Sequence, residues 1–363
     1  MVKSKQLYEV WMEILFNWIL IQWFKNYLNN RRQFTSVSKC DSNRLPTVHG
    51  VPQGSILGPL LFLFYVNDLH QSSSQLSFTL FADDTTILHT CPNHKGLIIS
   101  LNSELHQVSL WFRSNKLSLN HTKTNFIFFR KSPSSVHLNL SPVKIDDIPI
   151  QKVLSSKFLG VTVDHNLSWS QHISSITKTI SRNTGVLSRL SHFLNPSSLV
   201  LLYNTLILPY LNYCNIVWAH SGNSKLHDLY VTQKRSIRIC TLSHSRSHTA
   251  PLFAKLNTLN IYDIHKLQTG TFMYKFCHNL LPYSFATYFK STEVVHTYST
   301  RSRSGLYIPF TRTSYSMNTL RYYGPRIWNA IEDQIKNQSC VARFKSSYKR
   351  ALLSHYVAPL PDQ

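Results

Sequence analysis

The sequence predicts an α+β fold, and three features of the 363-residue chain indicate it. Two short β-prone runs flank an Asp-Asp pair at 78–88, a pattern typical of a β-hairpin with acidic residues at its bend. Apolar residues recur at helical spacing on both sides of that hairpin, at 7–28, 60–69 and 95–117. From residue 172 onward the pattern is almost entirely helical. We therefore expect strands mainly in the first half of the chain and helices in the second.

The charge balance indicates a polyanionic partner. The chain carries 38 Lys and Arg against 16 Asp and Glu, a net charge of +22 at pH 7. Such an excess is typical of proteins that bind nucleic acid. A membrane surface is the alternative, but no basic amphipathic helix supports it, and the apolar run at 14–24 is too short to span a bilayer. We expect no membrane association.

The six cysteines are scattered and form no CxxC pair. This usage predicts reduced, mostly packing side chains in an intracellular protein. We expect the cytoplasm, the nucleus or both.

Adjacent carboxylates at Asp83 and Asp84, in the run FTLFADDTTIL, give the clearest chemical signal. Like charges on one tight bend repel each other, and a divalent cation such as Mg²⁺, which takes hard oxygen ligands, removes that cost. The competing interpretation is a solvated turn in which Asp merely suits the backbone conformation. The pair alone leaves both interpretations open.

A loop rich in Gly and Pro, within GVPQGSILGPLLF at 50–62, lies upstream and leads into the predicted helix at 60–69. Such a loop lets backbone approach a flat or charged ligand closely. The glycine spacing matches neither the phosphate loop nor the dinucleotide fingerprint, so both are excluded.

GVPQGSILGPLLF followed by FADD resembles motifs B and C of the reverse transcriptases of non-LTR retrotransposons, the LINE and jockey-like elements. The resemblance implies an RNA-directed DNA polymerase with a right-hand palm, two Mg²⁺ ions, an RNA template, a DNA primer and deoxynucleoside triphosphates. It implies that Asp83 and Asp84 are catalytic and hold metal. The residues it assigns to the nucleotide and template pocket are Pro52, Gln53, Gly54, Ser55, Phe81 and Ala82.

Two later segments resemble motifs D and E of the same family. Lys123 matches the lysine that can protonate the leaving pyrophosphate; the alternative is a solvated lysine before the strand predicted at 125–129. KFLGVTVD at 157–164 is predicted as one strand, whose central glycine suggests that another backbone comes close. We interpret Asp164 as a cap of the following turn rather than a third catalytic acid. The primer grip implied by the resemblance is Lys157, Phe158, Leu159 and Gly160.

One element of the family pattern is missing from the sequence. Two-metal nucleotidyl transfer needs carboxylates on both sides of the metal pair, and in the family a strand upstream of motif B ends in one, the motif A aspartate. The acids before Gly50 are Glu9, Glu13 and Asp41, and none of them ends an apolar strand. We therefore expect an N-terminally truncated domain, an unpaired sheet edge beside the acidic hairpin, and impaired or absent catalysis.

The second half resembles a polymerase thumb followed by a basic helical region. Residues 291–325 interleave Arg and Tyr, as single-stranded nucleic-acid binding requires; a polar loop layer is the alternative. Residues 324–353 are predicted as one last helix. The expected domains are a partial palm at 1–165, thumb-like helices at 166–210, and a helical, basic C-terminal region at 211–363.

Two functional hypotheses follow. The first is the reverse transcriptase domain of a retrotransposon, impaired because the motif A aspartate is absent. The alternative is a non-catalytic basic RNA- or DNA-binding remnant of a mobile element. Binding by such a remnant would fall steeply with salt and would not depend on Mg²⁺ or Asp83.

Overall fold

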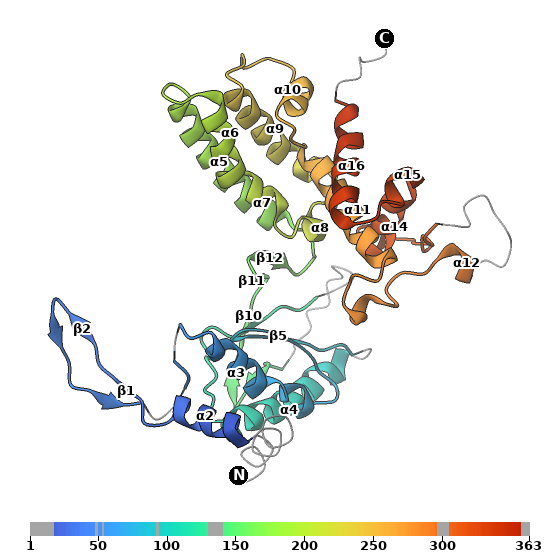
Figure 1. The fold of residues 1–363 in the computed structure, drawn as a ribbon. Helices are drawn as coiled ribbons and strands as arrows, with labels where there is room; N and C mark the ends of the chain where they lie inside the picture. Colours follow the sequence, from blue (N-terminus) through green and yellow to red (C-terminus); the bar gives the residue numbers. More distant parts are fainter. Residues whose placement is uncertain are drawn as a thin grey trace. The chain divides into compact units, whose positions relative to one another are not determined.

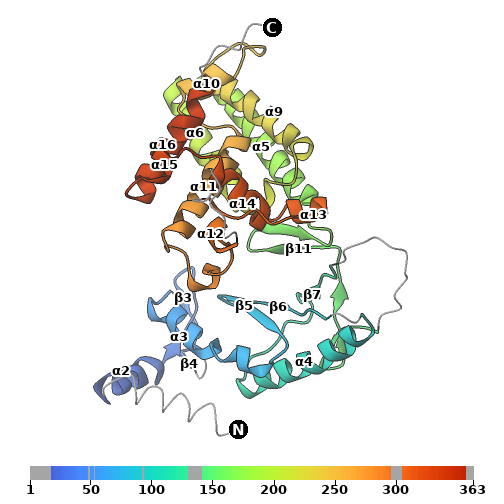
Figure 2. The same ribbon diagram turned by 90° about the vertical axis from the view of Figure 1, so that its right-hand side faces the viewer.

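The computed structural model describes residues 18–47, 50–52, 54–91, 94–129, 141–295 and 305–356. The chain divides into two compact units. The first comprises residues 1–128 and 132–153, and the second comprises residues 129–131 and 154–363. The division thus falls earlier than the palm boundary expected at residue 165. Helices and strands occur together in the first unit and helices dominate the second, in agreement with an α+β class (Figures 1 and 2).

Three α-helices form the framework of the first unit. α2 spans Trp18–Leu28, α3 spans Leu57–Val66 and α4 spans His94–Ser114, with a short 3₁₀ helix, η1, at Leu69–Ser72. Their positions agree with the helical periodicity of the sequence, although residues 7–17 of the first predicted helix lie outside the described residues. No helix in the described part of the chain is both long and apolar enough to cross a membrane.

The strands of the first unit form separate two-stranded sheets. β5 pairs with β6 and β8 with β9, both antiparallel, whereas β7 pairs with β10 in parallel. The strand predicted at 125–129 is therefore shorter than expected, because only two of its residues find a partner in β10. The bounds are β5 Ser77–Phe81, β6 Asp84–Leu88, β7 Asn125–Phe126, β8 Lys144–Ile145, β9 Ile148–Pro149 and β10 Gln151–Lys152.

A projecting β-ribbon, which we call the arm, precedes α3 and covers residues 31–47 (Figure 1). The sequence indicated only a β-prone stretch at 34–37 here. Both ladders of the arm are antiparallel. Its strands are β1 Arg32–Gln33, β2 Ser36–Val37, β3 Cys40–Asp41 and β4 Leu45–Pro46.

The core of the first unit is small and is organised by α4. One cluster contains Ile98 and Leu105 of α4 with Val143 and Ile145 from the β8 region. A second cluster joins Val108 to Leu69 and Leu76, next to the β5–β6 hairpin. α4 therefore anchors both hairpins of this unit.

The second unit begins with a β-hairpin and continues as a helical assembly with one continuous core. Its largest fully buried side chains include Trp218, Tyr203 and Tyr274. The hairpin consists of β11 Ser155–Phe158 and β12 Val161–Asp164. The helices are α5 Ser170–Leu190, α6 Pro196–Leu206, α7 Leu208–Asn212, α8 Asn215–Trp218, α9 Asn223–Cys240, α10 Ala250–Lys255, α11 Ile261–Cys277, η2 Tyr283–Phe285, α12 Thr292–Val295, α13 Ser314–Met317, α14 Leu320–Asn329, α15 Asp333–Lys336 and α16 Val341–Ser354.

The last predicted helix, at 324–353, is wrong as a single element. The structure has α14, α15 and α16 there, because Glu332 (ψ 140°) and Cys340 (ψ 160°) adopt extended backbone. These breaks let Trp328, Ile335 and Phe344, one from each helix, reach the same core.

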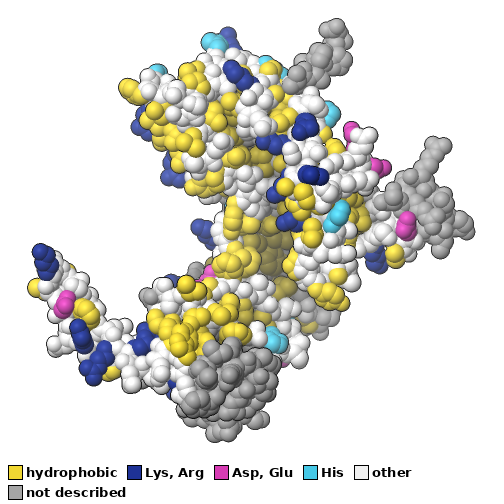
Figure 3. All heavy atoms as spheres, viewed as in Figure 1, with side chains coloured by type: hydrophobic (Ala, Val, Ile, Leu, Met, Phe, Trp, Pro, Cys, Tyr) yellow, Lys and Arg dark blue, Asp and Glu magenta, His cyan; other side chains and the backbone are white. Residues whose placement is uncertain are grey.

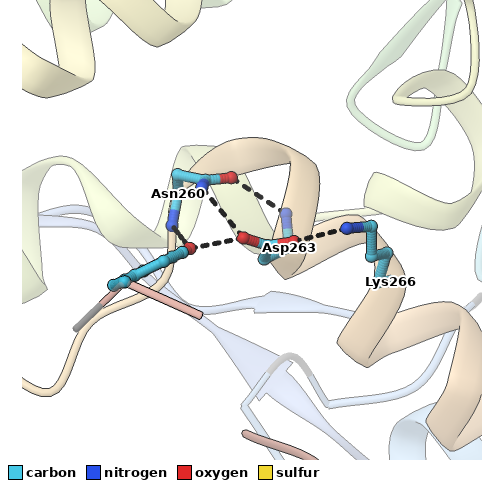
Figure 4. A network of polar contacts seen from close by, with 4 residues as sticks. Asn260, Asp263 and Lys266 are labelled. Atoms are coloured by element: carbon cyan, nitrogen blue, oxygen red, sulfur yellow. Dashed lines mark hydrogen bonds and ion pairs between the residues drawn. The ribbon is translucent and has the colours of Figure 1, made fainter. Parts of the chain in front are cut away.

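A polar network ties the end of this region to the start of α11 (Figure 4). The amide N–H of Asp263 donates to Asn260 Oδ1 over 3.0 Å, which caps the helix, and Asn260 Nδ2 donates to Asp263 Oδ2 over 2.9 Å. Lys266 Nζ lies 2.8 Å from Asp263 Oδ1. The Tyr356 hydroxyl donates to Asp263 Oδ2 over 2.5 Å. The buried Asp263 carboxylate is thereby compensated on both oxygens.

Candidate active site

The acidic hairpin predicted at 78–88 is present in the structure. β5 and β6 pair in antiparallel register, with Phe81 opposite Asp84, so Ala82 and Asp83 form a two-residue turn. Ala82 has φ +51°, a left-handed conformation that costs a non-glycine residue about 1–2 kcal/mol. Strained backbone of this kind is concentrated at functional sites, and here it lies next to the two aspartates.

One face of the hairpin is anchored, which fixes the position of its tip. Phe78 and Leu80 are half-buried while the residues between and beside them are exposed, the alternation of a strand with one face on a core. Phe78, Leu80 and Ile87 pack against the cluster of Leu69 and Val108. Asp83 and Asp84 lie at the other end of the hairpin and are exposed. Within the described residues, β5 and β6 pair only with each other, so their outer edges are unpaired.

The chain contains a second Asp-Asp pair, and the comparison between the two pairs is informative. Asp146 and Asp147 form the turn of the β8–β9 hairpin. Asp146 accepts a hydrogen bond from Ser109 Oγ over 2.5 Å and lies 3.1 Å from the Arg113 guanidinium. The Ser109 hydrogen bond is the main cause of a lowered pKa of Asp146; burial opposes it and the Arg113 charge adds to it.

Asp83 and Asp84 have no such compensation. Among the described residues, neither carboxylate has a hydrogen bond or an ion pair with another side chain or with backbone. Two adjacent, exposed and unpaired carboxylates on an anchored turn are arranged to receive a cation rather than to stabilise the fold.

The Gly/Pro loop is held against the first turn of α3. Ser55 Oγ donates to the carbonyl oxygen of Pro52 over 2.8 Å and accepts from the amide N–H of Gly58 over 3.0 Å. A Cβ at Gly58 would lie 3.0 Å from Ser55 Oγ and 3.2 Å from the Pro52 oxygen. Gly58, which sequence reasoning did not select, is therefore required for this close approach. Gly54 has φ +81°, and Gln53 lies outside the described residues.

Lys123 lies in an exposed turn before β7. Its amide N–H donates to Asn120 Oδ1 over 3.2 Å, and the same oxygen accepts from Thr122 Oγ1 over 2.7 Å. In the described part of the chain, no hydrogen bond or ion pair joins Lys123 to the Asp83–Asp84 pair. Its role as a proton donor stays a prediction.

The segment at 157–164 is a hairpin and not the single strand that was predicted. Leu159 (φ +44°) and Gly160 (φ +81°) form its two-residue turn, with both residues left-handed as in the turns that match strand twist. The group approaching Gly160 is a side chain: a Cβ there would lie 3.2 Å from Tyr213 Cε1. The four residues assigned to the primer grip thus belong to the second unit, together with Tyr213.

Asp164 caps the following turn, as expected from the sequence. Its carboxylate accepts hydrogen bonds from the amide N–H groups of Asn166, Ser168 and Trp169 over 2.8–3.1 Å. Burial is the largest influence on the pKa of Asp164 and raises it, but these hydrogen bonds and that of the Ser168 hydroxyl together lower it. Asp164 is thus a structural carboxylate.

The residues present supply only part of a metal site. The Asp83 and Asp84 carboxylates are the oxygen ligands that Mg²⁺ prefers. Among the described residues, however, no group of three or more His, Cys, Asp or Glu side chains could hold a metal ion. The donor chemistry therefore fits a divalent cation, while the number of protein ligands is below what two metal ions need.

Comparison with known proteins agrees with these features. Residues 2–163 match the family described as "Reverse transcriptase (RNA-dependent DNA polymerase)". The chain is 25% identical over 250 residues to "Probable RNA-directed DNA polymerase from transposon X-element" of Drosophila melanogaster, which covers 66% of this chain and 27% of the relative. It is 27% identical to the corresponding protein from transposon BS of the same species, over 60% of this chain and 25% of the relative.

A third relative is "RNA-directed DNA polymerase from mobile element jockey" of Drosophila melanogaster, 26% identical over 59% of this chain and 24% of the relative. The chain thus spans about a quarter of the length of the curated relatives it matches. No solved structure matches the chain significantly.

An acidic hairpin preceded by a glycine-rich loop and a helix, within a mixed helix-and-strand unit, defines a polymerase-like class of protein. Residues 2–163 are a reverse transcriptase domain of the kind found in LINE-like retrotransposons.

Proposed function

We propose that this domain serves RNA-directed DNA synthesis, the addition of deoxynucleotides to the 3′ end of a DNA primer on an RNA template. The observation that carries the proposal is the exposed Asp83–Asp84 pair, which lies on an anchored hairpin and has no protein partner in the described residues. The matched relatives are named for this activity, and the net charge of +22 suits a nucleic-acid substrate.

Each candidate residue has a role in this proposal. Asp83 and Asp84 would hold Mg²⁺, which when bound would stabilise the negative charge that develops on the transferring phosphate. The primer 3′ hydroxyl attacks the α-phosphorus of the incoming nucleotide, and the bond to pyrophosphate breaks. Lys123 would give a proton to that pyrophosphate. Pro52, Gln53, Gly54, Ser55, Phe81 and Ala82 would line the pocket for the nucleotide and template.

The second unit would bind the template–primer. In this proposal the β11–β12 hairpin grips the primer, and α5 and α6 act as a thumb. α5 supports this because Lys178, Arg182 and Arg189 are exposed on it and its sequence contains no Asp or Glu. Basic side chains on a helix surface contact phosphates without reading sequence.

We further propose that this chain alone polymerises slowly. Two-metal catalysis needs carboxylates that clamp both the attacking and the leaving oxygen, and the described residues offer only the Asp83–Asp84 pair. A missing ligand removes stabilisation that is made only in the transition state, and such losses reduce kcat directly.

Primer extension on a homopolymeric RNA template with a DNA oligonucleotide primer tests the proposal. We expect Mg²⁺-dependent incorporation of deoxynucleotides that Asp83→Asn abolishes. Asp147→Asn is the matched control, because Asp147 is also an exposed turn aspartate beside a second aspartate. The proposal fails if the purified chain shows no Mg²⁺-dependent incorporation even after prolonged incubation, or if Asp83→Asn and Asp147→Asn lose activity equally.

A further inference from the structure

The arm at 31–47 is a folded ribbon without a core. Its two ladders pair Arg32 with Pro46 and Val37 with Cys40 at their ends. Ser38 (φ +49°) and Lys39 (φ +67°) form a tight two-residue tip. Every side chain from residue 32 to residue 46 is exposed. Because an isolated two-stranded ribbon is only marginally stable in water, a ribbon that buries nothing is expected to have a binding role.

The arm is held to its own unit only at its base. Thr47 N–H donates to the carbonyl oxygen of Arg31 over 2.8 Å, and the Arg31 guanidinium reaches the carbonyl oxygen of Gly50 over 3.4 Å. Beyond that base the ribbon projects from the rest of the first unit (Figures 1 and 3). Eight residues a side give a reach of roughly 25 Å at strand spacing.

The charge of the arm is one-sided. Its 17 residues contain four cationic side chains and one acidic side chain, Asp41. This is about one cation in four residues, against 38 in 363 for the whole chain. The cations extend from base to tip, where dark-blue side chains are visible in Figure 3, and the Arg44 guanidinium lies 5.4 Å from the ring centre of Phe34. The four cations are Arg31, Arg32, Lys39 and Arg44.

We propose that the arm is a contact for double-stranded DNA and enters its major groove. The major groove of B-form DNA is about 12 Å wide and admits a two-stranded β-ribbon. The major groove of an A-form duplex is deep and too narrow for side chains to read. A cationic ribbon of this width therefore fits B-form DNA better than an RNA duplex or an A-like RNA–DNA hybrid. The arm is thus a surface separate from the one that would hold a template–primer hybrid.

The test compares two duplexes of identical sequence, one of DNA and one of RNA, each of 24 base pairs. Binding to the full chain is measured by fluorescence anisotropy over a series of salt concentrations, without nucleotides, so polymerase activity has no bearing on the result. The test variant is Arg32→Gln/Lys39→Gln/Arg44→Gln. The control variant, Arg343→Gln/Lys345→Gln/Arg350→Gln, removes three exposed cations from α16 instead.

If the arm enters the DNA groove, the test variant loses about 2 to 3 from the slope of log affinity against log salt on DNA, because each lost phosphate contact removes about 0.9. The slope on the RNA duplex stays within one contact of the unsubstituted chain, and the control variant does not weaken DNA binding more than RNA binding. Equal losses on DNA and RNA, or no loss on DNA, would overturn the proposal. Circular dichroism that matches the unsubstituted chain shows that the variants remain folded.

Discussion

The Tyr213 hydroxyl donates a 2.6 Å hydrogen bond to the carbonyl oxygen of Leu159, at the turn of the β11–β12 hairpin. The indole N–H of Trp218 in turn donates to the Tyr213 carbonyl oxygen over 2.9 Å, and the Trp218 ring meets the His172 ring edge-on. His172 Nδ1 accepts from the Thr162 amide N–H of β12 over 3.3 Å. These contacts form a closed circuit that fixes the hairpin to the helices of the second unit.

This circuit predicts an unusual cost for a small substitution. We expect Gly160→Ala to lower the free energy of unfolding by about 1–2 kcal/mol, because the new Cβ meets Tyr213 at a left-handed position. Gly185→Ala is the control: nothing lies within 4 Å of a Cβ there, and alanine in a helix gains about 0.5–1 kcal/mol over glycine. Urea denaturation measures both, and shifts of the same sign would contradict the role assigned to Tyr213.

Two buried histidines predict loss of stability in acid. His220 stacks on Tyr323 with ring centres 4.8 Å apart, and His265 lies 5.3 Å from the same ring. Burial is the main cause that lowers the pKa of each histidine to about 4. An unfolded histidine titrates near pH 6.5, so between about pH 6.5 and 4 the unfolded state binds more protons. Stability is thus fully present above that window and falls as the pH decreases through it.

The expected loss is up to roughly 3 kcal/mol for each histidine. Denaturant titrations at pH 7.5 and 4.5 measure it, and His220→Phe should reduce the difference between the two pH values. His227→Gln, at an exposed position, should leave the difference unchanged. A pH dependence that His220→Phe does not reduce would show that other groups cause it.

The Asp263 network predicts that one hydroxyl near the chain's end stabilises the second unit. We expect Tyr356→Phe to lower the free energy of unfolding by about 1–3 kcal/mol, because it removes a donor from a buried carboxylate. Tyr283→Phe, at a side chain that is 93% exposed, should have almost no effect. The same denaturant titration checks both, and equal small effects would mean that the network adds little.

The exposed apolar face of α3 predicts poor solubility of the chain on its own. Leu60, Leu63 and Phe64 expose 47–56% of their surface, and hydrophobic side chains gather in this region (Figure 3). Such patches promote association in water. We expect Leu63→Lys to raise the soluble fraction after expression, measured by centrifugation and light scattering, more than Leu201→Lys on α6 does. A monodisperse unsubstituted chain would contradict this expectation.

Local chemistry was predictable from the sequence where a few adjacent residues decide the structure. The alternation around Asp83 and Asp84 predicted the hairpin, and Asp164 was correctly expected to cap a turn. The turn at Leu159 and Gly160 was missed, because an apolar run with a central glycine suits a strand as well as a hairpin. Its turn depends on Tyr213, which is remote in sequence.

The candidate site was predictable in composition but not in its electrostatics. Two Asp-Asp pairs look alike in the sequence, and only packing distinguishes them: α4 brings Ser109 and Arg113 to Asp146, while Asp83 receives no partner within the described residues. The arm was not predicted either, because ten short-strand residues without buried side chains lack a hydrophobic period.

The central claim is that Asp83 and Asp84 bind a divalent cation, and its most direct test needs no catalysis. Mn²⁺ binding in the presence of primer–template and a non-reactive nucleotide is measured by electron paramagnetic resonance for the unsubstituted chain, Asp83→Asn/Asp84→Asn and Asp147→Asn. We predict that the unsubstituted chain and Asp147→Asn bind Mn²⁺ with the same affinity, while the double variant binds at least tenfold more weakly. Equal Mn²⁺ affinity in all three proteins would contradict the claim.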